Sequence, residues 1–333
     1  MFLEKYRKAH FPKTVFPEFK VDPQTCTHCG RCVESCPTMG LVMGPDELPS
    51  LRGFKGIEKA CLACRNCEAV CPVGACTIVG TYRVLEGRYK TILPEEVVPP
   101  GPLAQADGRS LEEALGALSP IERTILTRRS TRLFQDKPVP KEMILRILEA
   151  GRYAPSAGNC QPWKFVVITD RAVIREIEAE CMKVLRRFRD VYMGERPWNK
   201  SVSTLLSYLY VNKMDQRPMT AIEKADHCDN VIHWNAPVVI FILVDTRGIS
   251  NPDLDGGICA QNMVLAAHGM GLGTCYIGLT IAALDYLPSM RKKLGIVPPW
   301  KALTSLSIGF PKGRIDKPVA RNAVPVEWIE PRS

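Results

Sequence analysis

The sequence of 333 residues contains no apolar run long enough to cross a bilayer, which takes about 20 residues as a helix. The longest such run, Val238–Val244, predicts a buried strand instead. The first residues, Met1–Lys8, lack the apolar stretch of a secretory signal. We therefore expect a soluble, cytoplasmic protein with no membrane partner.

The sequence also lacks a long basic run, although its formal net charge is +9. Lysine and arginine are scattered along the chain, whereas nucleic-acid-binding domains gather them on one patch or stripe. We therefore expect no nucleic-acid partner. The composition, 46% hydrophobic and 24% charged, is that of an ordinary globular protein, and the length suggests two domains.

Cysteine, in contrast, is abundant, because the chain has 14 of them. Two runs share the pattern Cys-x-x-Cys-x-x-Cys-x-x-x-Cys-Pro. Their cysteines are Cys26, Cys29, Cys32, Cys36, Cys61, Cys64, Cys67 and Cys71. A disulfide framework would suit a small secreted domain, and paired zinc sites need neither the third cysteine nor the Cys-Pro step. Neither alternative fits this pattern as well as two iron–sulfur clusters do.

The spacing predicts which cysteines share a cluster. Three thiolates of one run reach three corners of one small cubane, and the fourth, before its proline, turns toward the other cluster. One [4Fe–4S] cluster is therefore expected on Cys26, Cys29, Cys32 and Cys71. The other is expected on Cys61, Cys64, Cys67 and Cys36. The stretch resembles the bacterial-type two-cluster ferredoxins over about the first 90 residues, with a longer segment between the runs.

The composition also predicts the domain boundaries. Prolines and glycines between Leu93 and Ser110 indicate an extended linker. We expect a ferredoxin-like domain at 1–93, a linker at 94–110 and a second domain at 111–333.

Hydrophobic periodicity predicts the secondary structure of both domains. Strands are expected at 19–22 and 76–79 in the first domain. In the second domain, strands are expected at 163–169, 237–245, 274–277 and 303–308. Helices are expected at 140–151, 171–190, 191–230 and 255–268, with Gly151 ending the first of these. Helices and strands without a regular βαβ rhythm favour an α+β fold over a doubly wound α/β fold.

Three polar segments of the second domain point to a phosphate-bearing, flat ligand. Arg128, Ser130 and Arg132 place two guanidiniums and a hydroxyl on one short segment, which suits a dianionic phosphate. The loop 155–163 carries small and amide residues, and the glycines of 269–278 permit close backbone approach. Each segment alone has an ordinary structural alternative: a solvated basic face, a helix-to-strand turn and a glycine-rich turn.

Together and in this order, the segments resemble the nitroreductase-like FMN proteins, over roughly residues 120 to 325. The further matching elements are Gln261-Asn262, Leu265–Ala267, Gly271–Gly273 and Ile308-Gly309. The resemblance implies an α+β sandwich that forms a homodimer, with one FMN at each end of the subunit interface. The predicted architecture is therefore a small 2[4Fe–4S] ferredoxin-like domain followed by a nitroreductase-like FMN-binding domain.

The resemblance also implies the FMN contacts. Arg128, Ser130 and Arg132 would hold the phosphate and ribityl end. Ser156, Asn159 and Gln161 would lie against the flavin of the partner subunit. The backbone at Ile277 and Gly278 would face the reactive edge of the ring. A basic residue of the C-terminal arm would complete the phosphate site, with Arg321 preferred over Arg314 and Lys317.

The combination predicts an FMN-dependent oxidoreductase that reduces a small electron-poor compound, such as a nitroaromatic or a quinone. Electrons would come from a ferredoxin or from NAD(P)H and would pass through the two clusters. Many relatives carry an acidic residue at the position of Ile277, so direct use of NAD(P)H does not carry over with the resemblance. No side-chain acid or base is expected, and residues 191–216 are either a lid over the ring or part of the core.

Two alternatives come from other functional classes. The chain could be a non-catalytic iron–sulfur flavoprotein that passes electrons between partners. It could also be a specialised relative, such as a reductive dehalogenase or a flavin-consuming synthase.

Overall fold

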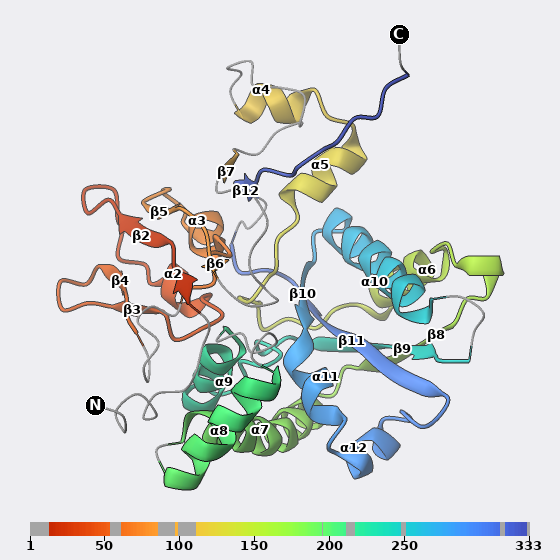
Figure 1. The fold of residues 1–333 in the computed structure, drawn as a ribbon. Coiled ribbons are helices and arrows are strands. Elements are labelled where there is room, and N and C mark those ends of the chain that lie inside the picture. Colours follow the sequence, from red (N-terminus) through yellow and green to blue (C-terminus); the bar gives the residue numbers. More distant parts are fainter. Residues whose placement is uncertain are drawn as a thin grey trace. The chain divides into compact units, whose positions relative to one another are not determined.

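The structure, a computed structural model, describes residues 13–53, 61–85, 97–98, 111–194, 196–210, 217–247, 251–313 and 317–331 (Figure 1). The chain divides into two compact units. The first contains Met1–Ser119, Tyr192–Arg217 and Pro318–Ser333, and the second contains Pro120–Val191 and Pro218–Lys317. Most of the expected linker 94–110 lies outside the described residues. The linker therefore stays a prediction.

The first unit is built around the two cysteine runs. Helix α2 (Arg31–Glu34) follows the first cysteine loop, and helix α3 (Asn66–Val70) follows the second. Strands β2 (Glu18–Val21) and β5 (Cys76–Val79) form an antiparallel pair. The strands expected at 19–22 and 76–79 are therefore confirmed to within one residue. The longer segment between the runs contains a hairpin of β3 (Leu41–Met43) and β4 (Pro49–Leu51).

Short elements complete the first unit. Strand β1 (Thr14–Val15) pairs with β6 (Arg83–Val84), and β7 (Val97–Val98) pairs with β12 (Arg321–Asn322). Two helices also belong to this unit, α4 (Leu111–Gly116) and α8 (Pro197–Tyr210). The C-terminal residues thus return to the unit that contains the N-terminal cysteine runs.

The second unit is organised on one antiparallel sheet. Its strands are β8 (Trp163–Ile168), β9 (Val238–Asp245), β10 (Gly273–Ile277) and β11 (Trp300–Gly309). Their order is β10-β11-β9-β8, so β10 is an edge strand. An antiparallel sheet with helices confirms the predicted α+β class.

Helices cover both faces of this sheet (Figure 1). On one face, α6 (Lys141–Arg152) and α10 (Pro252–Gly269) pack against alternate β9 residues such as Ile240 and Ile242. On the other face lie α11 (Gly278–Leu284) and α12 (Pro288–Lys293), shown in blue. The remaining helices are α5 (Pro120–Thr127), α7 (Arg171–Met193), α9 (Arg217–His227) and the short 3-10 turn η1 (Ala157–Asn159).

The prediction that Gly151 ends its helix is wrong. Helix α6 continues to Arg152, and Gly151 is buried inside it. A Cβ on Gly151 would lie only 2.8 Å from the side chain of Met263 and 3.1 Å from Cys259 Sγ. The glycine therefore serves the close packing of α6 on α10 and is not a helix stop.

A polar cluster is buried under the sheet on the α7 and α11 side. His233 is fully buried, with Thr280 Oγ1 3.0 Å from its Nε2 and Ser307 Oγ 3.4 Å from its Nδ1. The His233 backbone N–H donates to Glu178 Oε1 at 2.6 Å. Burial lowers the pKa of His233 to about 3 and raises the pKa of Glu178 to about 7. The imidazole is therefore neutral at ordinary pH.

No helix in the described part of the chain is long and apolar enough to pass through a membrane.

Glu178 makes the stability of the second unit pH-dependent. Folding raises the pKa of Glu178 from 4.5 to about 7. The stabilising contribution of the protonated carboxyl to the free energy of unfolding is therefore complete below pH 4.5 and is lost as the pH rises through 7. We expect Glu178→Gln, which keeps the acceptor oxygen, to remove this loss. Between about pH 5 and about pH 8, the variant should lose less unfolding free energy than the wild type, by up to about 3 kcal/mol.

The measurement is chemical unfolding at several pH values, followed by tryptophan fluorescence. Glu180→Gln is the matched control on the same helix and should follow the wild type. Parallel pH profiles for Glu178→Gln and the wild type would contradict the prediction.

Candidate functional site

The first cysteine-lined cavity is small and lies at the first cysteine loop. Its lining includes Cys26, Cys29 and Cys32 from the first run and Cys71 from the second. Cys76, which follows the second run on β5, also lines it. The cavity therefore gathers four of the predicted ligands, three from one run and one from the other.

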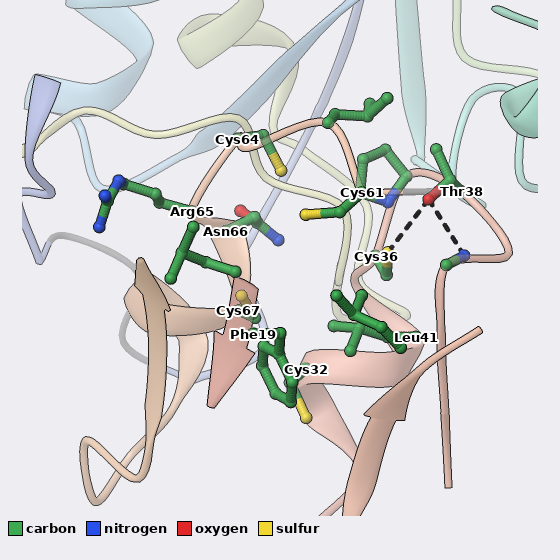
Figure 2. Close-up of a pocket in the computed structure, with 15 residues that line it drawn as sticks. Phe19, Cys32, Cys36, Thr38, Leu41, Cys61, Cys64, Arg65, Asn66 and Cys67 are labelled. Atoms are coloured by element: carbon green, nitrogen blue, oxygen red, sulfur yellow. Dashed lines mark hydrogen bonds between the residues drawn. The ribbon is translucent and has the colours of Figure 1, made fainter. Parts of the chain in front are cut away.

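The second cavity is lined by three cysteines of the second run and by one of the predicted ligands from the first run. Figure 2 shows Cys61, Cys64 and Cys67 around it together with Cys36 from the first run. Cys32 also reaches its wall. Both sets expected from the spacing are thus brought together, and four thiolates around a small cavity suit an iron–sulfur cubane.

The two cysteine loops repeat the same unusual backbone conformation. His28 and Gly30 have φ of 53° and 68°, and Ala63 and Arg65 at the equivalent places have φ of 55° and 54°. Turns of this kind direct successive backbone N–H groups into a concavity, where they stabilise an anion. Three of these residues are not glycine, so the conformation is strained and has to be held by its surroundings.

Neighbouring groups hold the second loop in place. The Arg65 guanidinium donates to Glu68 Oε1 at 2.9 Å, and the same oxygen accepts the Ile78 N–H at 2.6 Å. The Ala75 N–H lies 3.2 Å from Cys71 Sγ, which it can reach as a donor. Backbone N–H groups that point at ligand sulfurs are a common feature of iron–sulfur sites.

Residues 128–132, which we call the arginine segment, lie along the outer edge of β10 in the second unit. Ser130 forms a parallel bridge to Thr274, and the Thr131 N–H donates to the Thr274 carbonyl at 2.8 Å. Gly273 makes this approach possible, because a Cβ there would lie 2.3 Å from Thr131 Oγ1. The two predicted phosphate arginines flank the bridge, and both are half-buried.

An aromatic side chain lies beside one of the two arginines, Arg132. The Arg132 guanidinium lies 5.7 Å from the centre of the Trp234 ring, and Lys224 Nζ lies 5.2 Å from the same ring. Trp234 and Lys224 were missed in the sequence, because no local pattern connects them to the arginine segment.

Ile277 is the last residue of β10, and Gly278 follows it. Ile277 is buried at the end of β10, and Gly278 is exposed at the first position of α11. A Cβ on Gly278 would meet only open space within 4 Å. The structure thus places the arginine segment beside β10 and the Ile277–Gly278 peptide at the end of the same strand.

The polar loop also belongs to the second unit. Ser156 Oγ accepts the Gln161 N–H at 3.0 Å, and the Gln161 amide donates to Asn159 Oδ1 at 3.1 Å. Asn159 and Gln161 have positive φ, and both side chains are exposed. The loop therefore presents a pair of amides to solvent.

The basic residues expected from the C-terminal arm do not all belong to the unit that contains the arginine segment. Arg321 is exposed on β12, pairs with Val98 and belongs to the first unit. Lys317 is exposed, and Arg314 lies outside the described residues. The contribution of Arg321 to the phosphate site stays a prediction.

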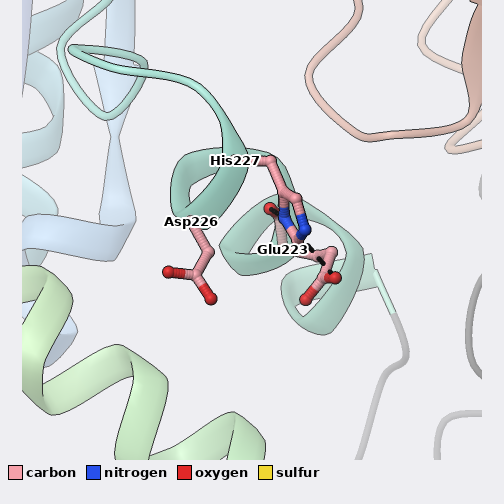
Figure 3. Close-up of side chains that lie close together, drawn as sticks. All are labelled: Glu223, Asp226 and His227. Carbon is pink, nitrogen blue, oxygen red and sulfur yellow. Dashed lines mark hydrogen bonds and ion pairs between the residues drawn. The ribbon is translucent and has the colours of Figure 1, made fainter.

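A second group of possible metal ligands lies on α9 and consists of Glu223, Asp226 and His227 (Figure 3). Arginines already neutralise its carboxylates. Arg189 lies 2.9 Å from Glu223 and also pairs with Asp226, which pairs with Arg186 as well. This arrangement is an ion-pair network between α7 and α9 and needs no cation.

Comparison with known proteins supports both halves of this description. Residues 125–310 match the model of the Nitroreductase family, and residues 25–75 match a 4Fe-4S dicluster domain. The chain is 28% identical over 222 residues to a chloronitrobenzene nitroreductase from Comamonas testosteroni, covering 63% of this chain and 93% of the relative. It is 30% identical over 202 residues to a nitrobenzene nitroreductase from Ectopseudomonas oleovorans, covering 57% and 86%.

Among solved structures, a nitroreductase with bound FMN from Bacteroides fragilis has a TM-score of 0.49 and 20% identity, covering 64% of this chain and all of that one. The matched ranges confirm the two resemblances seen in the sequence. The family match spans more than half of the chain. The chain therefore belongs to the nitroreductase family of flavin oxidoreductases and carries a 4Fe–4S dicluster domain before the family domain.

Proposed function

We propose that the chain is an FMN-dependent reductase of a small electron-poor compound, with electrons relayed through two [4Fe–4S] clusters. The observation that carries the proposal is the presence, in one chain, of two four-cysteine cavities and a family domain with an arginine-bearing sheet edge. Clusters pass single electrons, and FMN, when bound, converts them to the electron pairs that organic substrates take. The chemical class of the substrate, nitroaromatic or quinone, follows from the named relatives and from the resemblance.

In this proposal each cavity holds one cluster. Cys26, Cys29, Cys32 and Cys71 ligate the first. Cys61, Cys64, Cys67 and Cys36 ligate the second. The support is geometric: the fourth ligand of each set comes from the other run and reaches the same cavity.

The FMN phosphate is assigned to Arg128, Ser130 and Arg132. A dianionic phosphate needs charge-assisted donors, and guanidiniums supply them in a fixed fork. The side chains fit this task because the bridge to Thr274 fixes their segment and Trp234 supports Arg132. Arg321 of the C-terminal arm is proposed to complete the site, with Arg314 and Lys317 as rivals.

The remaining contacts assume a homodimer. Ser156, Asn159 and Gln161 form an exposed polar loop, which we assign to the flavin of the partner subunit. The Gly278 N–H is assigned to the reactive edge of the ring. Ile277 offers no acidic side chain at this position, so we favour a reduced ferredoxin over NAD(P)H as donor. For residues 191–216 both alternatives stay open, a lid over the ring or a part of the core.

An anaerobic titration of the full chain tests the function. Protein reconstituted with iron, sulfide and FMN is mixed separately with reduced ferredoxin, NADH and NADPH, and flavin absorbance is followed. We expect rapid bleaching by reduced ferredoxin and turnover on addition of a nitroaromatic or quinone. Bleaching without turnover on either substrate class would favour the non-catalytic electron carrier.

The crossed assignment of the cysteines is tested by pairs of variants. We expect Cys29→Ser with Cys71→Ser to lose about half of the iron, because both residues serve one cluster. Cys29→Ser with Cys36→Ser should lose nearly all of it, because each residue serves a different cluster. Iron analysis of anaerobically purified protein is the measurement, and Cys76→Ser is the control that should keep its iron. The reverse pattern for the two pairs would show that each run serves its own cluster.

The phosphate assignment is tested at Gly273. We expect Gly273→Ala to weaken FMN binding at least about tenfold, because its Cβ would displace Thr131 and with it the arginine segment. Gly257→Ala on α10 is the control, since a Cβ there meets nothing within 4 Å and a helical alanine stabilises by about 0.5–1 kcal/mol. The measurement is FMN fluorescence on titration with apoprotein. Equal affinity in the two variants would contradict the assignment.

A further inference from the structure

Two hydrogen bonds determine how the peptide groups of β10 are oriented. The Thr274 carbonyl accepts the Thr131 N–H at 2.8 Å, so it points to the outer edge of the sheet. The Ile277 carbonyl accepts from Ser305 Oγ at 3.2 Å, so it points inward toward β11. Carbonyls of successive strand residues alternate in direction, and these two observations agree with that alternation.

The direction of the Gly278 N–H follows from the same peptide group. A trans peptide is planar, with its N–H opposite its C=O. Because the Ile277 carbonyl points toward β11, the Gly278 N–H points to the outer edge of β10. This is the edge along which Ser130 and Thr131 lie.

Ser305 is placed to hold this orientation. It is fully buried on β11 and stands opposite Ile277 in the strand register. Rotating the peptide would break the serine hydrogen bond as well as the strand pairing at Ile277, and it would leave a buried hydroxyl without a partner, which is costly. The serine therefore adds a side-chain restraint to a peptide that leads into the exposed Gly278.

We propose that Ser305 is a positioning residue for the reaction: it locks the Ile277–Gly278 peptide so that the Gly278 N–H faces the flavin N5 position. This inference rests on the proposed FMN function. Oxidised flavin accepts a hydrogen bond at N5, whereas N5 of the reduced ring carries a hydrogen. A locked N–H donor therefore favours the oxidised ring and lowers the midpoint potential of the bound flavin.

The test compares Ser305→Ala with Ser307→Ala. Ser307 is the matched control, because it is also fully buried on β11 but its hydroxyl lies near His233, 3.4 Å from Nδ1. We expect Ser305→Ala to bind FMN and to raise its midpoint potential. The ratio of the dissociation constants for oxidised and reduced FMN should rise about three- to tenfold, the size of one net hydrogen bond. Ser307→Ala should keep the wild-type ratio.

Anaerobic redox titration and FMN binding in both oxidation states supply the measurements. Ser305→Cys, which keeps a weaker donor, is the second variant and should give a smaller rise. Flavin binding with an unchanged potential in both Ser305 variants, or an equal rise in Ser307→Ala, overturns the inference alone. Failure of the wild type to bind FMN overturns the proposed function and the inference together.

Discussion

The pairing of β10 with β11 is the interaction on which the candidate flavin site depends. It fixes the strand at the sheet edge, and the outer side of that strand then bonds the arginine segment at Thr274. Four strand positions later the chain reaches Gly278, about 13 Å away at the usual rise per residue. An exposed strand edge can pair with another chain and lead to aggregation, and here residues 130–131 cover one end of the β10 edge. The basic side chains and the exposed peptide thus follow one line, as an extended ligand requires.

A different constraint governs the cysteine-bearing unit. Its buried apolar cluster consists of Leu41, Ile78 and three cysteines, which is too little to stabilise a small domain through burial alone. The same unit keeps left-handed backbone at His28, Ala63 and Arg65, each of which costs roughly 1–2 kcal/mol. Metal–thiolate bonds offset both costs when clusters are bound. Ligand binding and folding of this unit are therefore one equilibrium.

Local patterns predicted most of the elements and the composition of both cavities. Cysteine spacing is short-range information, so it specifies which thiolates converge, and short apolar or alternating stretches indicate β8–β11. The features that the sequence mispredicted or missed depend on residues that are distant in the sequence. Gly151 looked like a helix stop because its neighbour Met263 is invisible in the local sequence. Trp234 and Ser305 belong to no local motif. Trp234 lies beside Arg132, and Ser305 donates a hydrogen bond to the Ile277 carbonyl, so both contacts come from the fold and not from the neighbouring sequence. The residues 318–333 could not be assigned to the first unit without the β7–β12 pair.

The return of β12 to β7 has a consequence for synthesis of the chain. The first unit takes residues from both ends and from 192–217, so it is discontinuous in sequence. During translation the second unit can collect all of its strands as soon as β11 has emerged. The unit with the cysteine runs also includes Arg321 and Asn322, which follow β11 in the chain. The cysteine runs are therefore translated before the second unit, whereas the β7–β12 pair of their own unit can form only after it.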